Sequence, residues 1–331
     1  MAADALRLPL AWMLGAMAAT TAAALAGLDL KVPVPLRRVM LAVLGVMLGS
    51  AFTPEIAGHA QHWLGSLAGL AGFVVVATLL TMLYLRKVGR YGMATAYFAS
   101  APGGLNEMTI IGAAMGGDDR VISLTHALRI LIIVFTVPVW FRLFGGYAGG
   151  GNTGLGALSD LGAGDLLVLA SCAVAGSLLA RLARLPAVAL TGPMLVSAAL
   201  HLSGITAARP PGELVSLAQV VLGAGIGCRF AGLRIARAVK VMVTALGSTA
   251  ILLVLGLAAT AGLAAWTGLP FAALLLAFVP GGLTEMCLIS MALGIDVAFV
   301  SAHHFARIVL VVMLAPLAFR LFRPMPQDAP S

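Results

Sequence analysis

Long apolar stretches separated by short polar segments run along almost the entire chain. Eleven of them approach the length of about 17–25 residues that a helix needs to cross a bilayer. Their side chains do not alternate between apolar and polar, as those of membrane-barrel strands do. Because backbone groups inside lipid must bond to one another, the pattern predicts an all-α polytopic membrane protein. The predicted segments are 9–27, 36–52, 63–85, 91–116, 119–144, 165–182, 187–204, 213–230, 239–266, 269–294 and 297–322.

Composition supports the same class. Of the 331 residues, 61% are hydrophobic and 10% are charged, whereas an average soluble domain carries about 25% charged residues. The formal net charge of +8 comes from Lys and Arg in short loops, which is typical of the positive-inside bias and leaves no basic domain for nucleic acid. The cysteines, Cys172, Cys228 and Cys287, lie within apolar runs without metal-ligand spacing, so we expect neither a metal nor a cofactor.

The chain contains an internal duplication. Residues 102–144 align with 280–322 at a constant offset of 178, with identical residues at 20 of 43 positions. Upstream, the GxxxG pair Gly45 and Gly49 matches Gly223 and Gly227, which predicts close helix packing in both copies. We expect a first repeat over 1–144, a Gly-rich linker with an unpaired helix over 145–182, and a second repeat over 183–331.

The distribution of Lys and Arg indicates how the two copies are oriented. If every segment crosses the membrane, the two copies are parallel. The 18 basic residues other than Arg129 and Arg307, which are predicted to be buried, then divide 10 to 8 between the two membrane faces. If both Pro-Gly-Gly segments enter and return on one side, the division is 15 to 3; if 165–182 fails to cross, it is 13 to 5. The positive-inside rule therefore favours two inverted five-segment repeats in a bacterial inner membrane, with the N-terminus outside and the C-terminus in the cytoplasm.

Each repeat contains a predicted helix break at Pro-Gly-Gly. Proline cannot continue the helical hydrogen bonds, and paired glycines permit unusual dihedral angles. We expect Asn106 or Thr284 to cap the half-helix that restarts, because Asn and Thr favour that position. The free amide groups of such a terminus attract an anion or a polarised oxygen. Two inverted copies would bring two termini together near the membrane midplane, as secondary transporters do.

Charged residues follow each break. Glu107 and Glu285 lie in the first turn of the half-helix, and Arg129 and Arg307 lie in the next helix. A charge at the bilayer centre costs at least about 2.5–3.5 kcal/mol, so we expect the ion pairs Glu107–Arg129 and Glu285–Arg307, or the same partners exchanged between copies.

A histidine lies three residues before each arginine, on the same helix face, and could relay a proton. Such groups can also be purely structural, and Asp118 and Asp296 are expected in the loop or cap after the half-helix. The candidate solute-binding residues are Pro102, Gly103, Gly104, Asn106, Glu107, His126, Arg129, Pro280, Gly281, Gly282, Thr284, Glu285, His304 and Arg307.

The duplicated Pro-Gly-Gly element, the Leu-Arg and Ala-Arg helices that follow it, and the turn at Gly192-Pro193-Met194 resemble the AbrB family of Gram-negative membrane proteins. The resemblance covers nearly the whole chain and implies a transporter-like architecture with broken crossing helices. Members are labelled as an ammonia monooxygenase or as a regulator of an alkylation-response flavoprotein. They carry an additional N-terminal helix and need not keep Glu at the positions of Glu107 and Glu285.

Two functions of different classes are compatible with these residues. The first is a secondary transporter, coupled to H⁺ or Na⁺, for a small polar or anionic solute. The alternative is a membrane-embedded sensor or regulator of gene expression that acts through a partner. We do not expect an enzyme, because the sequence contains no nucleophile elbow, HExxH or Walker motif. The expected partners are the solute, the coupling ion and membrane lipid, with a homo-oligomer left open.

Overall fold

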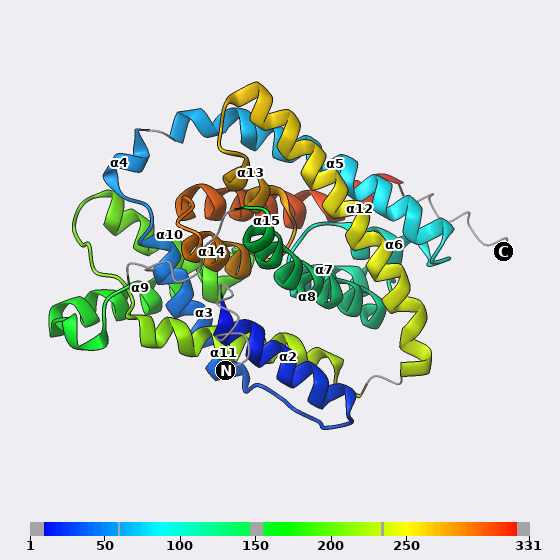
Figure 1. The fold of residues 1–331 in the computed structure, drawn as a ribbon, viewed down its shortest axis with the longest axis horizontal. Coiled ribbons are helices and arrows are strands. Elements are labelled where there is room, and N and C mark those ends of the chain that lie inside the picture. The colour runs from blue at the N-terminus through cyan, green and yellow to red at the C-terminus, as the bar shows by residue number, and fades with distance from the viewer. Residues whose placement is uncertain (1–9, 59, 146–154, 233–234, 323–331) are drawn as a thin grey trace, which may run out of the picture.

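Every regular element among the described residues of the computed structural model is helical (Figure 1). The structure describes residues 10–58, 60–145, 155–232 and 235–322; the Gly-rich part of the predicted linker, 146–154, lies outside them. The elements are α2 (Ala11–Leu25), α3 (Val34–Gly49), α4 (Pro54–Ala57), η1 (Ala60–Trp63), α5 (Leu64–Lys87), α6 (Met93–Ser100), α7 (Leu105–Ala114), α8 (Asp119–Leu143), η2 (Leu158–Asp160), α9 (Ala163–Leu182), α10 (Val188–Leu202), α11 (Gly212–Gly227), η3 (Cys228–Phe230), α12 (Ile235–Thr267), α13 (Phe271–Phe278), α14 (Leu283–Ala292) and α15 (Val297–Phe322).

Six of the eleven predicted segments form apolar helical stretches long enough to cross a membrane, which indicates a membrane protein. These are Gln61–Lys87, Asp119–Leu143, Ala163–Leu182, Gly212–Phe230, Val239–Thr267 and Val297–Leu321. The other five predicted segments form shorter helices or helices in two pieces. The segments 91–116 and 269–294 are each divided, into α6 and α7 and into α13 and α14.

The helices form two groups that meet along a seam. In the small bundle, α3 packs on α9, α10 and α11, and α11 packs on α2. In the large bundle, the long helices α5 and α12 pack on each other and cover α6, α8 and α13, while α7 packs on α8 and α14 on α15. Figure 1 shows the small bundle in the lower and left part of the view, α5 across the top, and α12 running diagonally from the lower right to the top. The seam runs where α3 meets α15 and α2 meets α8.

Glycines allow the small bundle to pack closely, as the GxxxG pairs predict. A Cβ on Gly45 of α3 would meet the carbonyl oxygen of Leu190 and lie 3.1 Å from Cβ of Pro193 on α10. At the equivalent position, a Cβ on Gly223 of α11 would meet the carbonyl oxygen of Met13 on α2. Each contact joins a helix of 1–144 to a helix of 183–331, so the two predicted repeats interlock and do not form separate bodies.

Gly45→Ala should lower the stability of the small bundle. The added methyl group would collide with a backbone carbonyl, which cannot rotate away, and such overpacking costs about 1–3 kcal/mol. The measurement is thermal unfolding of the detergent-purified protein. Gly15→Ala on α2 is the matched control, because a Cβ there meets nothing within 4 Å. Equal melting temperatures for the two variants would contradict the close approach of α3 and α10.

Candidate functional site

Both predicted helix breaks are present. Helix α6 ends at Ser100 and α7 begins at Leu105, while α13 ends at Phe278 and α14 begins at Leu283. The residue before each proline leaves the helical region, with ψ of 128° at Ala101 and 124° at Val279. This is the conformation that a following proline ring imposes on its neighbour. The prolines therefore determine where the half-helices end.

The predicted caps are wrong. The N-cap residues of the new half-helices are Gly104 and Gly282, without a side-chain cap, because the extended break continues to the last glycine. Asn106 lies in the first turn, and its Oδ1 accepts a hydrogen bond from Nη2 of Arg229 at 2.7 Å. Thr284 also lies in the first turn, and its hydroxyl hydrogen-bonds to Glu285.

The glutamates fold back over their own helix starts. A Cβ on Gly104 would meet Oε2 of Glu107, and a Cβ on Gly282 would meet Oε2 of Glu285. Glu285 is 8% exposed, whereas Glu107 is half-buried. A carboxylate in this place is stabilised by the partial positive charge of the helix start.

The predicted Glu–Arg ion pairs are wrong as well. Among the described residues, neither glutamate lies within 4.0 Å of Arg129 or Arg307, whereas Lys31 pairs with Asp29 at 2.7 Å in the loop before α3. The helix starts hold the carboxylates, so the arginines are left without an acidic partner.

Arg129 is 3% exposed and bonds to the end of α6. Its Nη1 donates to the carbonyl oxygen of Ala101 at 3.4 Å and its Nη2 to that of Gly103 at 3.3 Å. Ala101 is the C-cap of α6 and Gly103 lies in the break, and their carbonyl oxygens offset part of the cost of burying the guanidinium. Nε of Arg129 has no hydrogen-bond partner among the described residues.

Arg307 is equally buried and has fewer partners. Its Nη2 donates to Nδ1 of His304 at 2.8 Å, while its Nε and Nη1 find no partner in the part of the chain that the structure describes. Val311, one helical turn after Arg307, packs against Gly103, which accepts from Arg129. The two arginines therefore belong to the same buried interior. Unpaired buried donors of this kind are costly, and an anion would satisfy them.

The two histidines occupy equivalent places. Nε2 of His126 bonds to the carbonyl oxygen of Phe98 at 2.9 Å, and Nε2 of His304 to that of Leu276 at 2.8 Å. A carbonyl oxygen can only accept, so Nε2 carries the proton in both rings. Nδ1 of His304 accepts from Arg307, and Nδ1 of His126 has no partner among the described residues.

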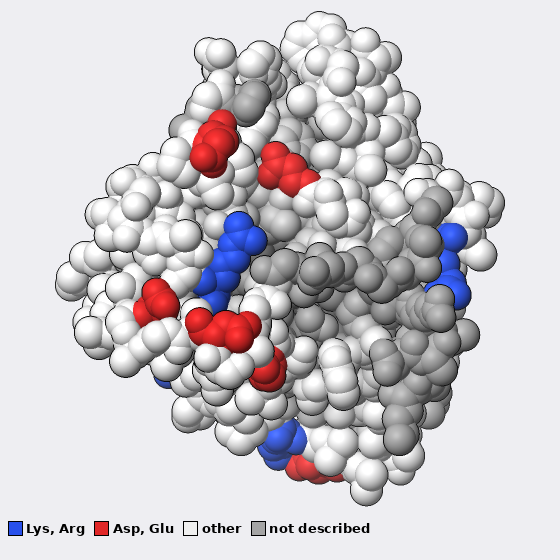
Figure 2. All heavy atoms as spheres, turned by 60° about the vertical axis from the view of Figure 1, so that its left-hand side comes forward, with Lys and Arg blue, Asp and Glu red and all other residues white. Residues whose placement is uncertain are grey.

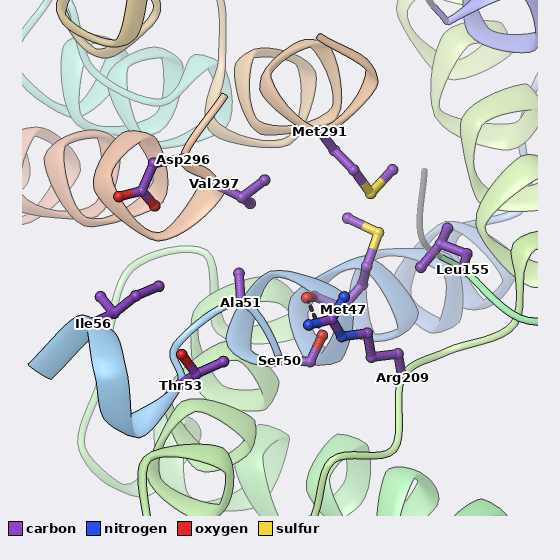
Figure 3. Close-up of a pocket in the computed structure, with 10 residues that line it drawn as sticks. All are labelled: Met47, Ser50, Ala51, Thr53, Ile56, Leu155, Arg209, Met291, Asp296 and Val297. Carbon is purple, nitrogen blue, oxygen red and sulfur yellow. Dashed lines mark hydrogen bonds between the residues drawn. The ribbon is translucent and has the colours of Figure 1, made fainter. Parts of the chain in front are cut away.

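Two cavities lie on the seam, at opposite ends of α3. The larger, about 1120 Å³, is lined by the first half of α3 together with α7, α9 and α10, and it reaches Asn106 and Glu107. The smaller, about 350 Å³, lies between the end of α3 and the large bundle (Figure 3). In Figure 3, the side chain of Met47 on α3 points toward that of Met291 on α14 across the smaller cavity.

The smaller cavity has a basic residue on one wall and an acidic residue on the other. Arg209, before α11, lines it opposite Asp296, which caps α15 by accepting from the amide of Phe299 at 3.0 Å. Asp118 caps α8 at the equivalent place, accepting from the amides of Arg120 and Val121. Both caps agree with the sequence expectation. Figure 2 shows basic atoms in a hollow of this face with acidic side chains around them.

The candidate residues gather at the two breaks of the large bundle, but sequence reasoning missed the basic residues of the seam. Arg37, Arg38 and Arg181 line the larger cavity, and Arg229 binds Asn106. The sequence showed them only as loop charge on one side of the membrane. No spacing motif connects them, because they come from three separate elements, α3, α9 and η3.

The fold and the site define a helical membrane protein with two broken helices and a buried pair of arginines. The family described as "Transition state regulatory protein AbrB" matches residues 12–323, and the chain belongs to this family. It is 27% identical over 318 residues to "Putative regulator AbrB" of Escherichia coli (strain K12), covering 96% of this chain and 91% of that protein. It is 26% identical over 301 residues to "Uncharacterized protein YhjN" of Bacillus subtilis (strain 168), covering 84% and 76%. No solved structure matches significantly.

A double-mutant cycle tests the absence of Glu–Arg pairing. Glu285→Gln and Arg307→Gln should change the free energy of unfolding additively, with a coupling below about 0.5 kcal/mol, because the two side chains share no bond. The matched cycle of His304→Ala with Arg307→Gln should show coupling of about 0.5–3 kcal/mol. Denaturant unfolding in detergent measures both. A larger coupling for Glu285 than for His304 would restore the predicted ion pair.

Proposed function

We propose that this protein is a secondary transporter for a small anionic solute in the bacterial inner membrane. The observation that carries the proposal is the burial of Arg129 and Arg307, with three guanidinium nitrogens that have no hydrogen-bond partner among the described residues. These donors lie in the helices that follow the two breaks, whose half-helix starts also favour negative charge. An anion bound here would satisfy the donors and balance the buried positive charge.

Contacts within the large bundle support inverted repeats. The amide of Asp118 at the start of α8 bonds to Thr95 at the start of α6, while Trp140 at the end of α8 contacts Phe271 at the start of α13, with ring centroids 6.3 Å apart. The equivalent helices α6 and α13 thus begin at opposite ends of α8. Such an arrangement is expected for copies related by an axis in the membrane plane.

Each break also packs against the other copy in the same way. A Cβ on Gly103 would lie 2.9 Å from Cγ1 of Val311, and one on Gly281 would lie 2.7 Å from Cγ2 of Ile133. Val311 and Ile133 differ by the repeat offset of 178. The two breaks therefore share one interior, as a single solute site needs.

The seam supports alternating access. Its cavities open at opposite ends of α3, and the buried Leu44 and Val46 lie between the two groups of lining residues. Rocking of the small bundle against the large bundle would widen one cavity as it narrows the other.

The second candidate is a membrane-embedded sensor. The relative in Escherichia coli is named as a regulator, and a sensor would use the same arginine site to bind an anion without moving it. Flux separates the two functions: a sensor binds the anion in detergent but does not transport it into liposomes.

Arg129→Ala and Arg307→Ala should each reduce anion uptake into proteoliposomes at least tenfold, because the solute loses its charge partner. Both variants should still insert and purify as the parent protein does. Arg184→Ala, an exposed loop residue outside both cavities, is the control and should keep full uptake. Undiminished uptake in both core variants would make Arg129 and Arg307 structural.

Single cysteines test the inverted topology in a cysteine-free background. Lys87→Cys lies on the side with 15 basic residues and Ser203→Cys lies at the far end of α10, and both positions are exposed. A membrane-impermeant maleimide should label Ser203→Cys from outside the cell and Lys87→Cys only in inverted vesicles. Labelling of both from the same side would contradict the proposed arrangement.

A further inference from the structure

The larger seam cavity combines basic side chains with walls that are mostly apolar. Its volume of about 1120 Å³ exceeds the upper end, about 1,000 Å³, of ordinary small-molecule sites. A small hydrophilic ion would leave most of this space empty. The size and the apolar walls of the cavity therefore do not match a small inorganic anion, although the arginines by themselves would bind one.

Arg37, Arg38 and Arg181 provide the basic side chains of this cavity. None of the three forms an ion pair with an acidic residue in the described ranges. Arg229 lies beside the same cavity, because its Nη2 donates to Asn106, one of the lining residues. The charge of these basic side chains would be balanced by a bound phosphate or carboxylate.

The apolar walls continue onto the outer surface of the protein. Val39 of α3, Ile110 of α7 and Val174 of α9 all line the cavity, yet they are 56%, 70% and 62% exposed. The cavity thus opens onto a surface that would face acyl chains as well as water. A molecule could enter from the bilayer and keep its apolar part against these side chains.

The charge distribution places this end of the cavity at the cytoplasmic surface. Arg37, Arg38 and Arg181 belong to the side that carries 15 of 18 basic residues. Basic pockets between membrane helices on this side are suited to anionic head groups. The arginines would lie at head-group depth, with the apolar walls at the depth of the chains.

We propose that this cavity binds an amphiphilic anion, with its phosphate or carboxylate head at Arg37, Arg38 and Arg181 and its apolar chain along α3, α7 and α9. The identification of this molecule as the transported solute rests on the proposed transport function, and it specifies the chemical class of that solute. The same chemistry is available from a phospholipid of the bilayer or from a free single-chain amphiphile.

The test compares three probes with the full-length protein in phosphatidylcholine nanodiscs: inorganic phosphate, dodecyl phosphate and added phosphatidylglycerol. Dodecyl phosphate should bind at least tenfold more tightly than inorganic phosphate, because burying its chain adds favourable free energy. Retention of phosphatidylglycerol in native mass spectra would identify a lipid source, and retention of dodecyl phosphate alone would identify a free amphiphile. Either result supports the inference.

Matched variants locate the site. Arg37→Gln and Arg181→Gln should weaken dodecyl phosphate binding at least tenfold, Arg37→Lys should retain part of it, and Arg184→Gln should leave it unchanged. Ala173→Trp should block the chain by filling the cavity wall and leave the head-group arginines in place. Thermal unfolding checks that each variant is folded.

Three outcomes would overturn the inference: equal binding of inorganic phosphate and dodecyl phosphate, equal losses in Arg181→Gln and Arg184→Gln, or a dimer whose partner helix covers Val39 and Val174. The two proposals fail separately. Binding of the amphiphile without flux would support the binding site and contradict the transport function. Flux of a hydrophilic anion without amphiphile binding would support the transport function and contradict this class of cargo.

Discussion

Breaking a helix inside a membrane leaves backbone groups that water cannot reach, and this constraint organises the centre of the protein. The negative end of α6 is held by Arg129, and the positive starts of α7 and α14 are held by Glu107 and Glu285. Glu107, Glu285 and Arg129 are thus placed against backbone groups at the breaks, whereas Arg307 bonds to the side chain of His304. This distribution explains why the arginines keep unpartnered donors although two carboxylates lie in the same region of the chain.

The two copies are equivalent in their contacts but differ in their conformation. His126 and His304 make the same hydrogen bond, and Gly103 and Gly281 meet the same position of the opposite copy. Yet Gly282 has φ of +97°, which favours glycine, whereas Gly104 has φ of −66°. The first break borders the large cavity, and the second is enclosed. One duplicated sequence thereby forms an open half and a closed half, which is the asymmetry that alternating access needs.

The small bundle depends on a different constraint, the close approach of backbones at Gly45 and Gly223. Because α3 packs on α10 and α2 on α11, each copy completes the other, and α3 lies along the seam for its whole length. Both cavities are therefore bounded by the same helix. Any displacement of α3 would change the two cavities together.

The sequence by itself determined the membrane class, the two helix breaks, the Asp118 and Asp296 caps, and close packing at the GxxxG pairs. Each follows from local rules: apolar length, the ring of proline, N-cap preference and the small size of glycine. Only the tertiary structure decided which charges meet. The pairing of Glu107 with Arg129 was predicted only from the free-energy cost of burying an unpaired charge. In the structure, each carboxylate instead lies against the start of its own half-helix. The arginines of the seam come from separate helices, and no sequence spacing records how those helices pack.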